Sequence, residues 1–376
     1  MISFFLFELI LPVCMLIYCL HVFRLCHALN EDARKPLTVN AATLPRISLI
    51  VPIKYNASAC SLCLQSLAQQ AYPHDKMEVV VVNDRADFDV ASMVKTVAAS
   101  YPQLNISCIP NHGSGKKQAI LSGLASASGT HVVLTDADCT HPTSWLETLL
   151  LPFLNDDCHL VLGPVQREGK KWMGIWDEAD YNGMMLWGMA SALLHKPVLA
   201  SSCNLAFRKK SFEQATPFVD NLHLAGGDDM FILMAFEKKF GSQSIHALVK
   251  RQALVKTEGV SSISSFLHAR IRWAAKTKYY LFSPSGLLAL GIGWLHLLLF
   301  AGLFFGLVYP TYLLPVIICI TGKTAADTLL LFTGKKILGT FHRPLLMPLL
   351  QVLQVLIIPL LIVMSAFASV RQWKTR

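Results

Sequence analysis

The sequence has 376 residues, more than one typical domain, which predicts one large domain with an appendage or two domains. Hydrophobic residues make up 53% of the chain and charged residues only 15%, which argues against an ordinary soluble enzyme and favours a membrane protein. The formal net charge of +9 suits nucleic acid, anionic lipid headgroups or a phosphorylated substrate, and the apolar ends of the chain favour lipid over nucleic acid.

The first apolar segment, residues 2–22, contains one acid, Glu8, and is long enough to cross a hydrocarbon core of about 30 Å. A cleaved signal peptide would need a basic start and a small-residue cleavage site, and both are missing. We therefore predict a retained anchor over residues 1–24. Arg24, Arg34 and Lys35 follow it, so the positive-inside rule predicts that the next segment lies in the cytoplasm. The expected location is the cell inner or plasma membrane, with the protein integral to it.

The middle of the chain alternates short apolar strands with helical patterns. Strands are expected at 47–53, 77–84, 105–111 and 131–138, with helices at 59–70, at 90–100 and from Lys116 onward. Repeated strand and helix units predict an α/β domain with a mostly parallel sheet and helices on both faces. We assign residues 25–282 to this domain. Ligands of such sheets bind outside the carboxyl ends of the strands.

Ten cysteines are scattered along the chain. Cys60 and Cys63 form a CxxC pattern, but no second pair or histidine cluster follows at zinc spacing. We interpret them as small buried side chains in a reducing compartment, without disulfides.

The stretch "NHGSGKKQA" at 111–119 is similar to a phosphate-binding loop. The P-loop pattern needs a glycine and a Ser or Thr where this sequence has Pro110 and Lys117, so a nucleoside triphosphatase is not indicated. Lys116 and Lys117 at a helix start are instead expected to form a positive rim able to face a phosphate, with a solvated lysine pair as the alternative.

Acidic residues follow two of the predicted strands. Asp84 ends the second strand, and Asp136 and Asp138 follow the fourth in "HVVLTDADCTHP". Alternate residues of an extended segment point the same way, so the last two carboxylates repel each other. Together the three acids suggest an oxygen-rich site for Mg²⁺ or Mn²⁺, which would hold a diphosphate. The alternative is that Asp136 and Asp138 only cap the following turn.

Two later stretches carry charge at helical positions. Gly226 and Gly227 permit a tight turn, after which Asp228 and Asp229 open a helix. Acids in a first helical turn commonly do no more than complement the helix dipole. The segment 264–282 is a predicted amphipathic helix that ends the α/β domain at the membrane interface. It carries Arg270, Arg272 and Trp273, and Arg and Trp are ordinary anchors at such an interface.

The carboxyl-terminal region, 283–376, is predicted to hold two or three membrane spans. Candidates are 287–308, 312–332 and 345–367, and Lys323 and Asp327 in the second of them are positioned to pair with one another. Three full crossings would place the basic tail 371–376 outside the cell, against the positive-inside rule. One of the last two segments is therefore expected to be re-entrant or interfacial.

The order of these motifs is more specific than any one of them. "IVPIKYNA", "VVVVNDRAD", "GSGKKQAILSGLASASGTHVVLTDAD", "SSCNLAFRKKSF", "GGDDMF" and "RIRW" follow one another over roughly residues 46–275. This series resembles the membrane-bound family 2 glycosyltransferases, which are inverting enzymes with the GT-A fold. The resemblance implies a nucleotide-diphosphate sugar as the donor substrate and Mg²⁺ or Mn²⁺ as the cofactor.

The resemblance also implies roles for individual residues. Asp138 would be the direct metal ligand, Asp136 would lie nearer the ribose or a metal-bound water, and Asp229 would be the general base beside Asp228 in the family's "ED" position. Further residues would contact the donor, namely Pro52, Asp84 and Lys116, or the acceptor and diphosphate, namely Asn204, Arg270, Arg272 and Trp273.

One departure bears on the product. Ala269 stands where the family's "QxxRW" motif has glutamine, a motif associated with processive synthases, which favours addition of a single sugar. The expected acceptor is a membrane-associated hydroxyl on a lipid-linked glycan or glycolipid, in cell-envelope glycan synthesis. The alternatives are a processive polysaccharide synthase, lipid glycosylation like that of ceramide glucosyltransferases and, less favoured, a non-catalytic membrane scaffold.

Overall fold

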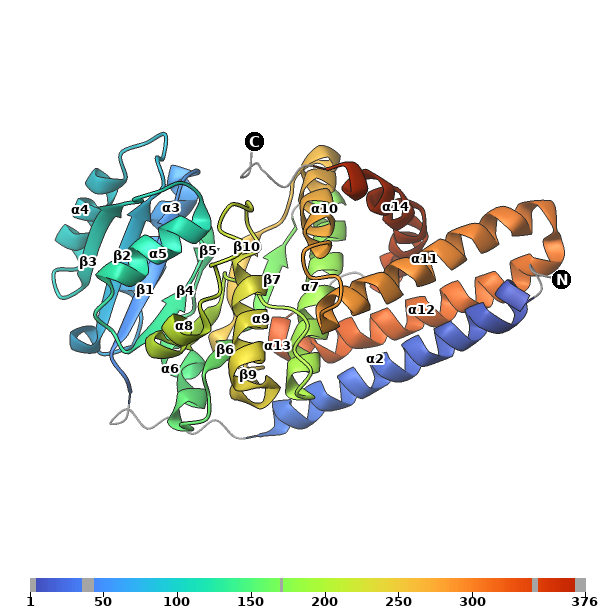
Figure 1. Ribbon diagram of the computed structural model, residues 1–376, viewed down its shortest axis with the longest axis horizontal. Coiled ribbons are helices and arrows are strands. Elements are labelled where there is room, and N and C mark those ends of the chain that lie inside the picture. Colours follow the sequence, from blue (N-terminus) through green and yellow to red (C-terminus); the bar gives the residue numbers. More distant parts are fainter. Residues whose placement is uncertain (1–4, 36–43, 170–171, 340–343, 369–376) are drawn as a thin grey trace.

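The structure is a computed structural model that describes residues 5–35, 44–169, 172–339 and 344–368. A seven-stranded sheet has the order β3-β2-β1-β4-β8-β6-β9 (Figure 1). Its strands are β1 (Ile47–Ile53), β2 (Met77–Asn83), β3 (Asn105–Pro110), β4 (His131–Leu134), β6 (Leu160–Leu162), β8 (Leu205–Arg208) and β9 (Ile245–Ala247). Strands β3, β2, β1 and β4 are parallel, as predicted, whereas β8 runs antiparallel between β4 and β6.

Helices cover both faces of this sheet, as the strand and helix alternation predicts. They are α3 (Ala57–Ala68), α4 (Val90–Ser100), α5 (Lys116–Ser126), α6 (Trp145–Leu149), α8 (Lys209–Ala215) and α9 (Asp228–Phe240). Successive strand residues enter different cores: Ile50 packs with helix α5, and Leu49 packs with α3 and α4. The alternation of side chains along a strand therefore produces two apolar layers. Cys60 and Cys63 are buried in the second layer, as predicted.

A second, three-stranded sheet lies at the carboxyl ends of the large sheet's strands. It has the order β5-β10-β7, with β5 (Cys139–Thr140), β7 (Val165–Glu168) and β10 (Val255–Glu258). Strand β5 begins one residue after Asp138, so pairing of Cys139 with Thr257 fixes the loop that carries the two acids.

Helix α7 (Trp172–Leu193) joins the α/β domain to the apolar helices and is mostly buried. It contacts β7 and β9 on one side and α2 (Leu11–Arg34) and α12 (Leu313–Thr333) on the other. Helix α10 (Ile263–Thr277) follows β10 and begins with a capping box in which Ser262 and Ser265 bond reciprocally. These two helices form the floor between the sheet and the membrane region.

Four helical segments are long and apolar enough to cross a membrane: 7–34, 284–308, 310–333 and 344–367. The amino-terminal helix comprises the π-helical turn Phe5–Ile10 and α2, and it continues ten residues beyond the predicted anchor boundary at 24. The others are α11 (Pro284–Val308), α12 and α14 (Met347–Phe367), with the short α13 (Lys335–Leu338) after α12.

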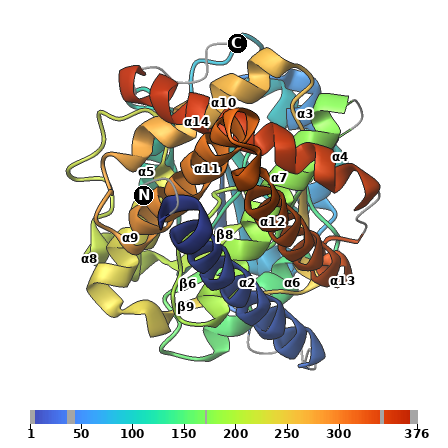
Figure 2. The same cartoon turned by 90° about the vertical axis from the view of Figure 1, so that its right-hand side faces the viewer.

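Helices α2, α11 and α12 pack along one another, whereas α14 crosses them at a steep angle (Figures 1 and 2). Helix α14 packs against α10 and α11, at the junction with the α/β domain. Lys323 and Asp327 pair as predicted, with 2.7 Å between Nζ and Oδ2. The basic tail at 371–376 lies outside the described residues.

Candidate active site

A cavity of about 570 Å³ opens at the carboxyl ends of β1 and β4 and continues toward the apolar helices. Most of the predicted site residues line it: Pro52, Lys116, Asp136, Asp138, Asp228, Asp229, Arg272 and Trp273. They come from β1, from the loop after β4 and from the first turns of α5, α9 and the second half of α10. The topology thus brings together motifs more than 200 residues apart. Asp84, Asn204 and Arg270 lie elsewhere, as described below.

The loop that carries Asp136 and Asp138 is anchored by a buried histidine. His141 bonds to Ser66 through Nδ1 and to Thr135 through Nε2, each at 2.8 Å. Burial lowers the pKa of His141 to about 3, so its ring is neutral at physiological pH and acts as a structural tie. Asp138 has no hydrogen bond to a backbone amide in the described part of the chain, so it is not a turn cap there.

Lys116 is the positive charge that offsets the repulsion between the acids. Its Nζ lies 2.5 Å from Asp136 Oδ1 and 3.1 Å from Asp228 Oδ2, and it also bonds to the Ser202 hydroxyl. Burial acts to lower the pKa of Lys116, but the two carboxylates outweigh it and raise the pKa well above its ordinary value. One ammonium therefore ties the loop after β4 to the start of α9.

Lys117 does not form the positive rim predicted with Lys116. Its side chain is 3% exposed and its Nζ donates to the carbonyl oxygens of Asn221 and Leu224, at 2.5 and 3.2 Å. It also lies 4.3 Å from the centre of the Phe231 ring. Neighbouring residues of a helix point about 100° apart, so the second lysine enters the core where the first enters the cavity.

Asp84 holds a loop and does not line the cavity, and its predicted contact with the nucleotide stays a prediction. Its carboxylate is 3% exposed, accepts from Asn111 Nδ2 at 2.6 Å and accepts from the Gly115 amide at 3.2 Å. Gly115 has a φ of 88°, in the region that favours glycine. In a phosphate-binding loop this backbone amide would face the ligand. Here the Gly115 amide donates to the carboxylate of Asp84 instead.

Asp229 lies where the tight turn before α9 meets the cavity. Gly226 and Gly227 have φ values of 72° and 74°, so this turn requires glycine, as the sequence predicts. Burial, and then the neighbouring charge of Asp228, raise the pKa of Asp229 to about 6. A carboxylate with a pKa near the working pH can accept a proton and release it again.

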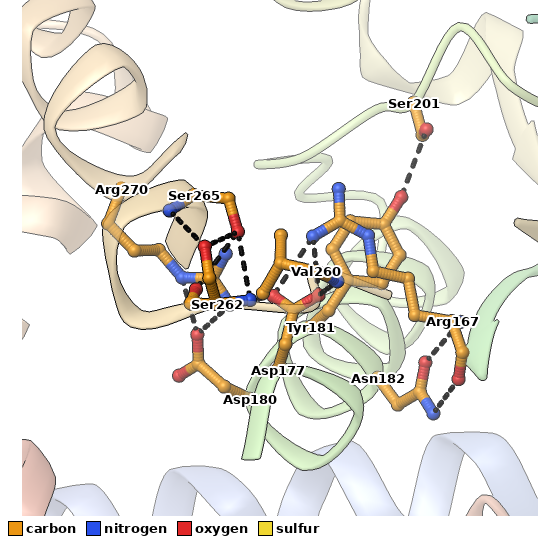
Figure 3. A network of polar contacts seen from close by, with 10 residues as sticks. All are labelled: Arg167, Asp177, Asp180, Tyr181, Asn182, Ser201, Val260, Ser262, Ser265 and Arg270. Atoms are coloured by element: carbon orange, nitrogen blue, oxygen red, sulfur yellow. Dashed lines mark hydrogen bonds and ion pairs between the residues drawn. The ribbon is translucent and has the colours of Figure 1, made fainter. Parts of the chain in front are cut away.

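Arg270 does not line the cavity, and its predicted role beside Arg272 stays a prediction. Its guanidinium lies 2.9 Å from Asp177 Oδ1 and 2.5 Å from Asp180 Oδ2, both on α7 (Figure 3). Residues two apart on a helix point about 200° apart, so Arg270 and Arg272 occupy opposite faces of α10.

Asp177 is the centre of this network and is completely buried. It accepts from Arg167 Nη1 with both oxygens at 3.0 Å and from the Val260 amide at 3.0 Å, in addition to Arg270 (Figure 3). The network joins β7, α7 and the segment that leads into α10. It thereby fixes the face that α10 presents to the cavity.

That face carries two cations, Arg272 and Lys276, which both line the cavity. Neither side chain has a hydrogen bond or ion pair within the described residues, and burial lowers the pKa of both. Lys276 lies against the turn before α9. Its Nζ is so close to Gly226 that a Cβ placed on this glycine would be 3.1 Å from it. The sequence prediction omitted Lys276, although its spacing of four residues from Arg272 places both on one helix face.

Asn204 is buried beneath the site and is fully used by the protein. Its Nδ2 donates to Pro164 and Ala253 carbonyls at 2.8 Å, and its Oδ1 accepts from Trp145 Nε1 at 2.9 Å. The predicted role at the acceptor or diphosphate is therefore not supported by its position. The residue joins β8 to α6 and to the small sheet instead.

The two acids, Asp136 and Asp138, suit a metal ion whose remaining ligands come from the substrate. In the described ranges, no group of three or more His, Cys, Asp or Glu side chains is arranged to hold a cation. Asp138 nevertheless lines the cavity without an ion pair there, while Asp136 is engaged by Lys116. Mg²⁺ is commonly bound by one or two carboxylates together with substrate phosphates, and Asp138 suits that mode.

Residues 48–216 match the family Glycosyl transferase family 2. Within this segment the chain is similar to the family 2 glycosyl transferases. The matched segment begins in β1 and includes the loop with Asp136 and Asp138, whereas Asp229 and Arg272, which also line the cavity, lie beyond it. Helix α9 and helix α10 follow it.

Curated relatives and a solved structure agree with this similarity. Glycosyltransferase AglE of Haloferax volcanii is 27% identical over 187 residues, 50% of this chain and 60% of that protein. Beta-monoglucosyldiacylglycerol synthase of Synechocystis is 30% identical over 134 residues, 35% of this chain and 28% of the relative. The match thus covers less than two thirds of either relative.

The mannosyltransferase PcManGT of Pyrobaculum calidifontis, solved with GDP-mannose and Mn²⁺, has the same fold. It superposes with a TM-score of 0.57 at 20% identity, covering 95% of this chain and 98% of that one. The predicted GT-A fold with flanking apolar helices is thereby confirmed.

Proposed function

We propose that this protein is an inverting glycosyltransferase that moves a sugar from a nucleotide-diphosphate donor to a hydroxyl of a membrane-associated acceptor, in cell-envelope glycan synthesis. The acceptor is a lipid-linked glycan or a glycolipid. One observation carries this proposal: a single cavity holds the carboxylate of Asp138, the carboxylate of Asp229 and the cations Arg272 and Lys276, and then continues between apolar helices.

Asp229 is suited to be the general base. In an inverting transfer the acceptor hydroxyl attacks the anomeric carbon from the face opposite the diphosphate, through an oxocarbenium-like transition state. The hydroxyl must lose its proton as the new bond forms, and the raised pKa of Asp229 makes it a better acceptor for that proton than an ordinary aspartate. Lys116 holds the adjacent Asp228 and keeps the start of α9 in place.

Arg272 and Lys276 are suited to the leaving diphosphate. Both are cations without a carboxylate partner within the described residues, and both lie on the cavity face of α10. A bound Mg²⁺ or Mn²⁺ on Asp138 would add Lewis-acid stabilisation of the same charge. The negative charge that develops as the diphosphate leaves is thus faced by preorganised positive groups.

The relatives support the substrate classes. The Pyrobaculum structure contains GDP-mannose with Mn²⁺, and the Synechocystis relative is named as a glycolipid synthase. A catalytic domain joined to apolar helices at both ends is placed to reach an acceptor in the membrane. We infer that this domain faces the cytoplasm, since Arg24, Arg34 and Lys35 follow the first span.

Transfer of radiolabelled sugars from a panel of nucleotide sugars into a membrane lipid extract, by the full-length protein with Mn²⁺, tests the proposal. We expect label in the organic phase. Label in a polymer would favour a processive synthase, and no transfer from any donor would favour a non-catalytic scaffold.

The variant Asp229→Asn tests the base. Turnover should fall by about 10²–10⁴-fold, the usual contribution of general-base catalysis, while donor affinity measured by isothermal titration stays unchanged. The control is Asp220→Asn, an exposed acid outside the cavity, which should behave like the wild type. Near-normal turnover of Asp229→Asn would refute the assignment.

A further inference from the structure

The cavity does not end at the catalytic carboxylates. It continues past α10 into the junction between α7, α11, α12 and α14. Its inner end is lined by Asp180, Leu288, Ile292, Lys323, Asp327, Leu330, Leu331, Met347, Leu350, Gln351 and Gln354. Most of these residues are apolar, but five of them form two polar groups, and all of the five except Asp180 lie on helices that could cross a membrane.

The first polar group is centred on Lys323 of α12. Its Nζ lies 2.7 Å from Asp327 Oδ2 and donates to Gln351 Oε1 at 2.9 Å, and the Gln351 amide also donates to Asp327. Lys323 and Gln351 are 3% and 2% exposed. The positive charge is therefore fully matched by a negative one, and the group as a whole is neutral.

The second polar group joins Asp180 of α7 to Gln354 of α14. Gln354 Nε2 donates to Asp180 Oδ1 at 2.9 Å, while Arg270 binds the other carboxylate oxygen. The amide oxygen of Gln354 has no partner within the described residues and its side chain lines the cavity. This group is also neutral, and it offers hydrogen-bonding atoms at the point where α14 crosses the bundle.

The first group lies between the middle of α12 and the end of α12 that is next to the α/β domain. Asp327 and Lys323 are six and ten residues before the end of α12 at Thr333, about 9 and 15 Å from the end next to the α/β domain at 1.5 Å per residue. Polar side chains at such a depth are costly unless they serve packing or a ligand. The adjoining walls include Trp176 and Trp187, whose buried indole N–H groups have no acceptor within the described residues.

We infer that the inner end of the cavity binds an uncharged, hydroxyl-bearing headgroup of a membrane lipid, a glycosyl or glycerol group, and that the acceptor is not a lipid phosphate. This inference rests on the proposed transferase function and names its acceptor class. Amide, carboxylate and indole groups exchange hydrogen bonds with hydroxyls, and the apolar side chains of α11 and α12 contact the chain of the lipid.

Charge is what separates the two lipid classes. A lipid phosphate would require an unpaired cation at the inner end, and the only basic side chain in the described lining of that end, Lys323, is already neutralised by Asp327. Seating a phosphate there would add a negative charge beside Asp180 and Asp327. The two cations without partners, Arg272 and Lys276, lie on the side of Asp229, where the proposed function places the donor diphosphate.

The test compares two acceptors of equal apolar length with the full-length protein in lipid nanodiscs. One is an alkyl glucoside or a glycosyl diacylglycerol, and the other is a polyprenyl phosphate. With a labelled nucleotide sugar and Mn²⁺, we expect transfer to the neutral acceptor and none to the phosphate. Transfer only to the phosphate, or to neither acceptor, would overturn the inference.

A variant locates the binding site. Gln354→Leu removes the amide that lines the inner end, so KM for the neutral acceptor should rise about tenfold with little change in kcat, the cost expected for a lost buried hydrogen bond. Gln214→Leu, at an exposed position on α8, is the matched control. An unchanged KM in Gln354→Leu would contradict the proposed site.

Donor binding separates failure of this inference from failure of the proposed function. Isothermal titration of the nucleotide sugar with Mn²⁺ depends on the strand-end site alone and also reports whether Gln354→Leu is folded. Donor binding with transfer only to polyprenyl phosphate would leave a glycosyltransferase with a different acceptor. Absence of donor binding in the wild type would contradict the transferase function itself.

Discussion

The carboxyl group of Asp229 is held where its charge is disfavoured, by burial and by Asp228. Its pKa is about 6, above the ordinary value, so the proposed base is protonated, and therefore unable to accept a proton, at acidic pH. We expect kcat/KM to fall as the pH drops below about 6 and to level off above it. A pH profile of sugar transfer at saturating Mn²⁺ measures this limb. A limb near pH 4 would indicate an unshifted carboxyl.

A variant of Lys276 tests whether the second cation of α10 binds the diphosphate. Replacing it by Met removes a positive charge from the face that carries Arg272, and the affinity for the nucleotide diphosphate should fall about tenfold because a charge-assisted contact is lost. Isothermal titration with a nucleoside diphosphate and Mn²⁺ is the measurement. Lys278→Met, an exposed lysine two residues away, should bind like the wild type. Equal affinities in the two variants would exclude the role.

The chemistry of the site follows from the sequence more fully than its geometry does. Lys116 and Lys117 are identical in type, and Arg270 and Arg272 are separated by one residue, yet one member of each pair lines the cavity and the other stabilises the protein. Which member faces the ligand depends on how the helix is rotated about its axis. That rotation is set by tertiary contacts such as those of Asp177, which local sequence does not contain.

At the scale of elements, α7 connects the catalytic sheet to the membrane helices through Asp177. Asp177→Ala would leave the guanidinium groups of Arg167 and Arg270 buried without their shared carboxylate, a change that typically costs about 3–5 kcal/mol. We expect the unfolding temperature in detergent to drop by several degrees. Asp156→Ala removes an exposed partner of Arg208 and should leave this temperature unchanged.

An equal unfolding temperature in both variants would show that the network does not stabilise the domain.

Helix α7 itself was not predicted. Its pattern, "WMGIWDEADYNGMMLWGMASAL", is apolar on nearly every side with a few acids, because it is buried between two layers and pairs those acids with distant arginines. The strands and helices from 47 to 138 were predicted well, since each has one or two clearly apolar faces.

At the scale of the whole molecule, the steep crossing of α14 bears on the topology. If α2, α11 and α12 span the bilayer and α14 lies across them without spanning, both ends of α14 stay on the side of the catalytic domain. Basic residues would then gather on that side, namely Arg34, Lys35, Lys335 and Lys336. The predicted conflict with the basic tail at 371–376 disappears in this arrangement.

Protease protection tests it. In sealed vesicles of known orientation, a tag after residue 376 should be cleaved from the same side as the catalytic domain, and a tag before residue 1 should be protected. A carboxyl-terminal tag accessible only from the opposite side would show that α14 is a full fourth crossing.

The contribution of α14 to the cavity wall also sets an order on biosynthesis. The segments that carry the proposed catalytic acids are translated first, but Met347, Leu350 and Gln354 complete the chamber only after α11 and α12 have been made. A nascent chain therefore has its carboxylates long before it has an enclosed place for an acceptor. The acceptor site is complete only after the last membrane segment has been inserted. A chain whose synthesis stops before that point therefore has an open site that is not expected to carry out transfer.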